Sequence, residues 1–372
     1  MKKKFGGRVA RISFDTGYAC PWGKCVFCRN DSFSPIVSVN MRKDNRHETL
    51  EKSMTFLKNR YNNKFFAAYF QSGTSTSGPV EKLREFYRSA ASVEGVVAFI
   101  VSTRPDYIDE EKIKMILESV PAHIDEIWIE LGLQSVKEES LKWIDRGHSP
   151  DDYFQAVELI EKYGQGRIKV APHIILGIPG ETIEDMINTV LKSIENPVVK
   201  GLKLHHLQIH RGTVLEKMYQ KNPFNLLTSD EYIKIMGEII AVIPQDKVLF
   251  RLFTTAPEEY LVAPIWNLGT PLPHFDRMRY ECHRWIVGRD PFGRPYGGRR
   301  YSLGIECSDS DLSSFRRSSG GHGDCSDRFT GADYGSKSAH RSVPGSVRIH
   351  LSFSWSCNAL DASAIRAIYT AK

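Results

Sequence analysis

Residues 96–133 read VVAFIVSTRPDYIDEEKIKMILESVPAHIDEIWIELGL, and this stretch decides the fold. Two apolar runs, 96–102 and 126–133, have the length and the β-branched content of buried strands. Residues 109–119 between them repeat apolar side chains at the spacing of an amphipathic helix. A strand, a helix and a second strand in this order predict a right-handed crossover between parallel neighbours.

The same unit recurs along the chain. The other candidate strands are 8–15, 65–71, 168–176 and 201–210, and the other candidate helices are 44–60, 79–91, 137–145, 151–163, 181–195 and 228–243. Six strands separated by helices predict an α/β protein with a parallel sheet. Periodicity alone fits a barrel-like sheet or an open doubly wound one. In both, functional side chains follow the carboxyl ends of the strands.

Composition narrows the class of protein. The chain of 372 residues is 41% apolar and 25% charged, which suits a globular protein and excludes overall disorder. No apolar run has the length of a membrane span, and the N-terminus lacks the apolar region of a secretory signal. We therefore expect a cytoplasmic protein that does not act at a membrane. Seven cysteines are an odd number and too sparse for a disulfide scaffold.

The composition changes near residue 288. Residues 1–288 hold 38 basic and 36 acidic side chains, whereas 289–372 hold 12 and 8, so the net charge divides into +2 and +4. Residues 301–372 contain 16 serines and little periodicity. We interpret 289–372 as a low-complexity, disordered tail. A non-native stretch from a shifted reading frame and a folded tail domain are the alternatives.

Three cysteines lie directly after the first predicted strand, in Cys20-Pro-Trp-Gly-Lys-Cys25-Val-Phe-Cys28. Three thiolates so close together can hold one soft metal centre. The next cysteine is Cys282, and three ligands on a [4Fe–4S] cluster would leave one iron open to a cofactor. A zinc site completed by His47 and a redox dithiol are the alternatives.

Further motifs follow the predicted strands in order. They are Tyr69-Phe70-Gln71, Ser102-Thr103-Arg104-Pro105-Asp106, Glu130-Leu131-Gly132-Leu133-Gln134-Ser135, Arg146-Gly147-His148, Gly177-Ile178-Pro179-Gly180-Glu181-Thr182 and Lys203-Leu204-His205. With the cysteine motif, they resemble the radical SAM superfamily, and within it the YhcC-like branch. This branch is related to the radical SAM domain of the Elongator catalytic subunit. The resemblance covers about residues 5–288.

The resemblance implies a (β/α)6 partial TIM-type barrel in residues 1–243, with a C-terminal extension, 244–288, packed on it. It implies that Cys20, Cys25 and Cys28 ligate a [4Fe–4S] cluster beside S-adenosylmethionine (SAM). One electron, from a reductant such as a flavodoxin or ferredoxin, would cleave SAM to a 5′-deoxyadenosyl radical that abstracts hydrogen from a substrate. The spacing C-x4-C-x2-C departs from the commoner C-x3-C-x2-C, and the usual Gly-Gly-Glu after the second strand is missing here.

The motif residues have predicted roles at this site. The expected cofactor-binding residues are Phe27, Gln71, Ser72, Thr74, Glu130, Gln134, Arg146, Gly177 and Pro179. Glu130 would bind SAM if its side chain faces inward, or belong to a satisfied buried network. Arg146 would pair with the SAM carboxylate, or form a surface salt bridge.

Three side chains on the fifth and sixth predicted strands are candidates for catalysis or substrate binding: His173, Lys203 and His205. Alternation places Lys203 and His205 on one face, which contacts the substrate if that face is inward.

The sequence does not identify the substrate. The Elongator relationship points to RNA, in particular tRNA, but the chain shows no acetyltransferase domain. A net charge of +2 also lacks the basic excess of a dedicated nucleic-acid binder. The alternative function is that of a non-catalytic iron–sulfur or zinc protein that binds a partner or nucleic acid.

Overall fold

The computed structural model describes residues 2–29, 38–252, 254 and 256–266. The predicted tail, 289–372, lies outside the described residues. The predicted extension is described only up to Trp266, so its boundaries remain predictions.

Within the described residues, one parallel sheet of eight strands forms the centre of the molecule, in the order β2-β1-β3-β4-β5-β6-β7-β9. Its strands are β1 (Val9–Asp15), β2 (Val39–Asn40), β3 (Phe65–Phe70), β4 (Val96–Thr103), β5 (Glu126–Gln134), β6 (Ile168–Leu176), β7 (Gly201–His206) and β9 (Val248–Arg251). The edge strands β2 and β9 do not pair with each other in this part of the chain, so the sheet is a partial barrel, as predicted.

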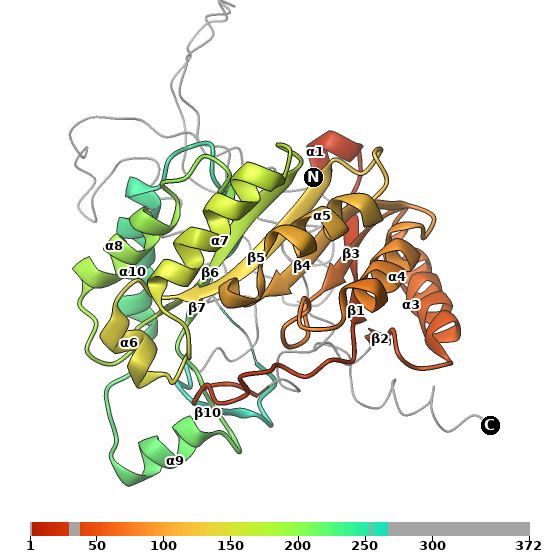
Figure 1. Cartoon of the computed structure of the whole chain (residues 1–372). Helices are drawn as coiled ribbons and strands as arrows, with labels where there is room; N and C mark the ends of the chain where they lie inside the picture. Colours follow the sequence, from red (N-terminus) through yellow and green to blue (C-terminus); the bar gives the residue numbers. More distant parts are fainter. Residues whose placement is uncertain (1, 30–37, 253, 255, 267–372) are drawn as a thin grey trace, which may run out of the picture.

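Helices between the strands cover the outer face of the sheet (Figure 1). They are α3 (Arg46–Tyr61), α4 (Val80–Ala91), α5 (Glu110–Ser119), α6 (Glu138–Trp143), α7 (Pro150–Tyr163), α8 (Ile183–Ser193) and α10 (Ser229–Val242). The short helix α1 (Lys2–Phe5) precedes β1, and α9 (Val214–Lys221) lies beyond the end of the sheet (Figure 1). Thr228 caps α10, with its hydroxyl accepting from the backbone N–H of Glu231. None of the helices in the described ranges is both long and apolar enough to cross a bilayer.

The main hydrophobic core lies between the sheet and the outer helices. Alternation along β1 sends Ile12 and Phe14 into this core, where each is at most 2% exposed. Phe70 of β3 packs edge-on against Tyr87 of α4, with ring centroids 4.7 Å apart. The alternate residues, such as Arg11 of β1, are half-buried and line the inner face. Each strand therefore presents every second side chain to the interior of the barrel.

The predicted strand 201–210 is two strands in the structure. β7 ends at His206, and β8 (Ile209–His210) pairs antiparallel with β10 (Leu261–Ala263) outside the main sheet. The side chain of Gln208 connects β7 and β8, because it bonds to both His206 and His210. His210 therefore lies off the sixth predicted strand, whereas Lys203 and His205 lie on β7 and share its inner face.

Candidate active site

The cysteine loop is anchored at the carboxyl ends of the strands. The backbone N–H of Val26 donates to the carbonyl of Ile144, just after α6, at 3.0 Å. The carbonyl of Val26 accepts from Leu215 of α9 at 2.9 Å. Two elements distant in sequence thus hold the loop from both sides. Along it, Cys20 is half-buried, Cys25 is buried and Cys28 is exposed, and none of the three forms a disulfide.

Cys20 lies in a polar setting that favours the thiolate. Burial raises its pKa, but the hydroxyl of Thr74, 3.3 Å away, and the backbone N–H groups of Gly23 and Trp22 lower the pKa below the usual value overall. The turn after β3 comes close to Cys20, because a Cβ on Gly73 would lie 3.4 Å from the Cys20 nitrogen. Since thiolates are the form that binds metal, this environment suits a ligand.

Arg146 brings a positive charge to Cys25. Its Nη1 lies 3.5 Å from the Cys25 Sγ, and its Nε and Nη2 donate to the Gly132 carbonyl at 3.2 and 2.8 Å. A Cβ on Gly132 would lie 2.5 Å from Nη2. The absence of a side chain at Gly132 therefore lets the guanidinium reach the buried thiol.

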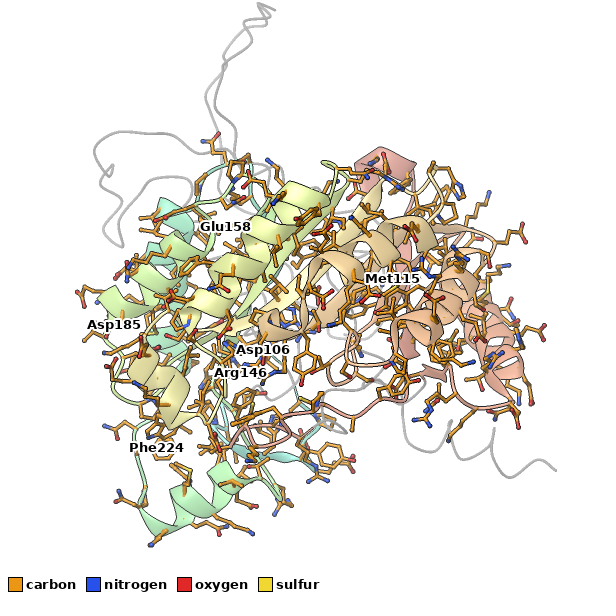
Figure 2. All side chains as sticks on the ribbon, viewed as in Figure 1. Asp106, Met115, Arg146, Glu158, Asp185 and Phe224 are labelled. Atoms are coloured by element: carbon orange, nitrogen blue, oxygen red, sulfur yellow. The ribbon has the colours of Figure 1, made fainter. Side chains whose placement is uncertain are left out.

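A second arginine supports the Arg146 loop. Arg104 donates to the Arg146 carbonyl at 2.8 Å and forms a bidentate pair with Asp106 at 2.9 and 2.7 Å. Figure 2 shows Asp106 and Arg146 together at this end of the sheet. Trp22 of the cysteine loop donates to the Asp145 carbonyl at 2.7 Å and packs its ring on Gly147. Trp22 and the loop around Gly147 also line an open cavity of about 550 Å³.

The geometry of the donor side chains bears on the choice between a zinc ion and an iron–sulfur cluster. In the described part of the chain, no three His, Cys, Asp or Glu side chains converge on a point as a single ion requires, and His47 completes no such set. A four-iron cluster is larger, and its thiolates bind different iron atoms. Three thiols on one loop, with a cation beside Cys25, fit that cluster better than a zinc ion.

The inner face of the sheet carries a buried polar network centred on Glu130. Its Oε2 accepts hydrogen bonds at 2.6–2.9 Å from Tyr69, Ser102, His173 and Lys203. Lys203 also donates to the Tyr69 hydroxyl at 2.6 Å. Glu130 and Lys203 are only 3% and 4% exposed. Glu130 therefore has the satisfied network that was one of its two sequence interpretations.

Charge and burial compete within this network. Burial raises the pKa of Glu130, but attraction to Lys203 and His173 holds it well below the usual value. Burial lowers the pKa of Lys203 to about 7, although Glu130 opposes this. Burial and the neighbouring ammonium lower the pKa of His173 to about 4. His173 is therefore neutral at pH 7, and Lys203 titrates near it.

His205 extends the same inner face. Its ring lies 5.4 Å from that of His173, and its Nδ1 contacts the Thr254 hydroxyl at 2.5 Å. Its Nε2 is buried without a hydrogen-bond partner among the described residues. The three predicted substrate-side residues, His173, Lys203 and His205, thus lie together on the inner face.

The other predicted cofactor residues are distributed around the end of the barrel. Phe27 packs against the apolar cluster of Val26, Ile144 and Leu215. Gly177 packs on Leu227, and Pro179 follows it in the turn before α8. Gln71 and Ser72 lie in the turn after β3, and Gln134 ends β5 with φ at 74°. The structure brings Thr74 and Arg146 to the cysteines.

Some residues at the site were missed as candidates. Trp22 and Gly132 lie inside quoted motifs, but their packing partners are distant in sequence. Arg11 and Arg251 lie at opposite ends of the barrel sequence. The sequence signals for Arg11 are the alternation of β1, which turns polar side chains to one face, and its place among the basic residues near the N-terminus.

Comparison with known proteins identifies this arrangement. The family model of the Radical SAM superfamily matches residues 15–192, and that of the Radical_SAM C-terminal domain matches residues 199–271. The chain is 34% identical over 275 residues to the uncharacterized protein MJ0486 of Methanocaldococcus jannaschii, covering 72% of this chain and 83% of that protein. The chain belongs to the radical SAM superfamily.

Other relatives place it within the superfamily. YhcC of Escherichia coli is 30% identical over 306 residues, covering 80% of this chain and 94% of YhcC, which supports the YhcC-like branch. A tRNA uridine(34) acetyltransferase of Methanocaldococcus infernus is 32% identical over 178 residues, covering 46% of this chain and 32% of that protein. The solved archaeal Elp3 of the same organism shares the fold, with a TM-score of 0.51 at 23% identity over 63% of this chain and 57% of that one.

Membership of the radical SAM superfamily establishes the class of protein. The chain is a radical SAM enzyme whose cofactors are a [4Fe–4S] cluster and SAM. Its general reaction is reductive cleavage of SAM, which requires a one-electron reductant. These conclusions confirm the predicted enzyme class and cofactors.

Proposed function

We propose that this enzyme holds its cluster with Cys20, Cys25 and Cys28 and abstracts a hydrogen atom from a substrate bound inside the barrel. The observation that carries the proposal is the cysteine loop itself, fixed at the carboxyl ends of the strands with Arg146 at 3.5 Å from Cys25. When bound, the cluster and SAM supply the 5′-deoxyadenosyl radical. The chain supplies the position of the reactants and excludes water.

Different residues around the cysteine loop would bind the cluster and SAM. Thr74 and the backbone donors near it stabilise the Cys20 thiolate. Arg146 uses three N–H groups on Gly132 and Cys25, so two of its five remain for the SAM carboxylate. The cofactor would then lie against the remaining predicted residues: Phe27, Gln71, Ser72, Gln134, Gly177 and Pro179.

The residues on the inner face of the sheet would contact the substrate. Glu130 bonds through its Oε2 to His173 and Lys203, so it positions these two side chains. His205 keeps its Nε2 available. We infer that His205 and the exposed part of His173 contact the substrate, with Lys203 held behind them.

Electrons would enter on the side of Cys28. Cys28 is exposed, whereas Cys25 is buried, so the cluster comes closest to solvent beside Cys28. Lys24, four residues earlier, is exposed and lies 4.9 Å from the centre of the Trp22 ring. An exposed cation at this point suits an acidic one-electron donor of the flavodoxin or ferredoxin type.

The test is anaerobic reconstitution with iron and sulfide, reduction with dithionite and addition of SAM. We expect an electron paramagnetic resonance signal of [4Fe–4S]+ that changes with SAM, followed by release of 5′-deoxyadenosine. Cys25→Ala should abolish both, whereas Cys282→Ala, outside the motif, should retain both. A colourless zinc protein that never cleaves SAM would support the non-catalytic alternative and refute the proposal.

The substrate requires a separate screen. Relatives named tRNA uridine(34) acetyltransferase make tRNA one member of that screen, and small metabolites are the other. The readout is the deuterium content of 5′-deoxyadenosine after incubation with deuterated candidates. Transfer of deuterium from a candidate identifies the hydrogen donor.

A further inference from the structure

Three cations from distant parts of the sequence meet on the inner face of the barrel. Arg11 comes from β1, Lys203 from β7 and Arg251 from β9, although β1 and β9 lie near opposite edges of the sheet. Burial and repulsion from Arg11 lower the pKa of Arg251, and both arginines also lower the pKa of Lys203. Arg251 pairs in register with Lys203 across β7 and β9, and Arg11 and Lys203 both lie over the Tyr69 ring, so the curved sheet gathers the three cations on its inner face.

One carboxylate faces these three cations. Glu130 bonds to Lys203 at 2.8 Å, and no ion pair of Arg11 or Arg251 occurs within the described ranges. Arg11 lies 5.3 Å from the centre of the Tyr69 ring, and Lys203 lies 5.1 Å from the same ring. His173 and His205 add no positive charge at pH 7, because burial lowers both of their pKa values. Among the described residues, this layer therefore carries two arginines in excess of its negative charge, and both are half-buried, so a bound anion would stabilise them.

The side chain of His205 provides a second observation at this part of the inner face. His205 has a buried Nε2 with no partner among the described residues, while Thr254 engages its Nδ1. Thr254 lies three residues after Arg251 and contacts His205, and burial together with the charge of Arg251 lowers the pKa of His205 well below its usual value. When the Thr254 hydroxyl donates to Nδ1, Nε2 carries the proton and becomes a third donor beside the two arginines.

We propose that Arg11, Arg251 and His205 bind an anionic group of the substrate, a carboxylate or phosphate of a small molecule. This deepens the proposed function and rests on it, because it places the substrate inside the barrel. Guanidinium groups suit either oxyanion through paired N–H donors. Lys203 behind them has two N–H groups engaged by Glu130 and Tyr69, and its third is left for the ligand.

The position of the cations favours a small ligand over a polynucleotide. Arg11 and Lys203 lie in the middle of their strands and not in the loops beyond them. A structured nucleic acid would instead meet exposed arginines and lysines through its phosphates. Binding of tRNA that does not depend on the inner arginines is therefore an outcome against the proposal.

The test is calorimetric titration of the reconstituted protein with inorganic phosphate, and separately with citrate, at constant ionic strength. The wild type should bind one of these probes saturably. Arg11→Gln and Arg251→Gln should weaken that binding on the order of tenfold or more, since each removes a charged donor. Arg88→Gln is the matched control, because Arg88 is exposed on α4. Equal affinity in all four proteins, or no saturable binding, would overturn the proposal.

A further variant tests whether weak binding by Arg251→Gln results from misfolding instead of the lost guanidinium. Arg251→Lys keeps the charge without the planar fork, and we expect it to fold with binding between that of the wild type and Arg251→Gln. Release of 5′-deoxyadenosine by the wild type is measured separately. If 5′-deoxyadenosine is not released but anion binding depends on the two arginines, only the enzyme proposal is refuted. If 5′-deoxyadenosine is released but anion binding does not depend on the arginines, only the anion site is refuted.

Discussion

The guanidinium of Arg146 lies against the buried thiol of Cys25, with Nη1 3.5 Å from Sγ, while the same group is fixed by the carbonyl of Gly132. This places a permanent positive charge beside a proposed cluster ligand. A cation stabilises the more negative, reduced form of a cluster, so Arg146 should raise the reduction potential.

Arg146→Gln should therefore lower the midpoint potential of the cluster. An interaction free energy of about 1 kcal/mol between Arg146 and the cluster corresponds to a change in midpoint potential on the order of 50 mV for one electron. The measurement is a redox titration followed by electron paramagnetic resonance. Arg146→Lys keeps a charge and should shift the potential less. An unchanged potential in Arg146→Gln would show that the charge is screened from the cluster.

Gly132→Ala should reproduce part of this effect without altering any charge. The added Cβ would lie 2.5 Å from Nη2 of Arg146 and 2.9 Å from Nε2 of Gln134, so both side chains must move. We expect a lower midpoint potential and a loss of about 1–3 kcal/mol in the free energy of unfolding. Gly166→Ala is the control for the midpoint potential of the cluster, because no atom lies within 4 Å of its added Cβ. Equal potentials in the two variants would contradict the role of Gly132.

The Glu130–Lys203 pair should show strong coupling. Glu130→Gln leaves Lys203 buried without its counter-charge and should cost about 3–5 kcal/mol in urea unfolding at pH 6. The double variant Glu130→Gln with Lys203→Met should recover part of that loss, which a double-mutant cycle measures. Glu138→Gln breaks the exposed pair with Lys142 and should cost less than about 1 kcal/mol. Additive losses in the cycle would mean that the two side chains act independently.

Stability should fall in mild acid because of His206. Burial and repulsion from His210 lower its pKa from 6.5 to about 3, and the residue is 4% exposed. Since the folded-state pKa is the lower one, this stability is present above pH 6.5 and is lost as the pH falls toward 3. Between pH 7 and pH 5 the loss is about 2 kcal/mol from this residue.

His206→Phe should remove that part of the pH dependence, because a phenyl ring can still stack on Trp266, whose ring lies 4.0 Å away. Urea unfolding at pH 7 and pH 5 measures the difference. The exposed His123 offers the comparison: His123→Gln should keep the pH dependence of the wild type. If His206→Phe kept it as well, the histidine would be protonated in the folded protein.

The sequence predicted the repeating units well, because their strands are buried on both sides and their helices are amphipathic. It missed β9 and β10, which are only a few residues long and carry no clear periodicity. The helix α9 was also missed, although Thr213 caps it and accepts from the N–H of Glu216. Short elements give too few residues for a period to appear.

The site was predictable to the extent that its residues share a motif. The three cysteines were proposed as cluster ligands from their spacing, and that role stays a prediction. Alternation along one strand predicted that Lys203 and His205 share a face, and the structure shows that this face is inward. The network around Glu130 was one of two interpretations, because the sequence cannot show that Tyr69 and Ser102 reach the same oxygen. The meeting of Arg11 with Arg251 depends on the curvature of the whole sheet, which no local pattern encodes.

The graded exposure of the cysteines, from buried Cys25 to exposed Cys28, also sets the order in which the site can be damaged. In protein without a cluster, an alkylating reagent should modify Cys28 before Cys25. With Cys28 as a cluster ligand, the iron bound to Cys28 would be the one that dissolved oxygen meets first. An enzyme with this arrangement stays active where oxygen is scarce, or where that iron is replaced as fast as it is lost.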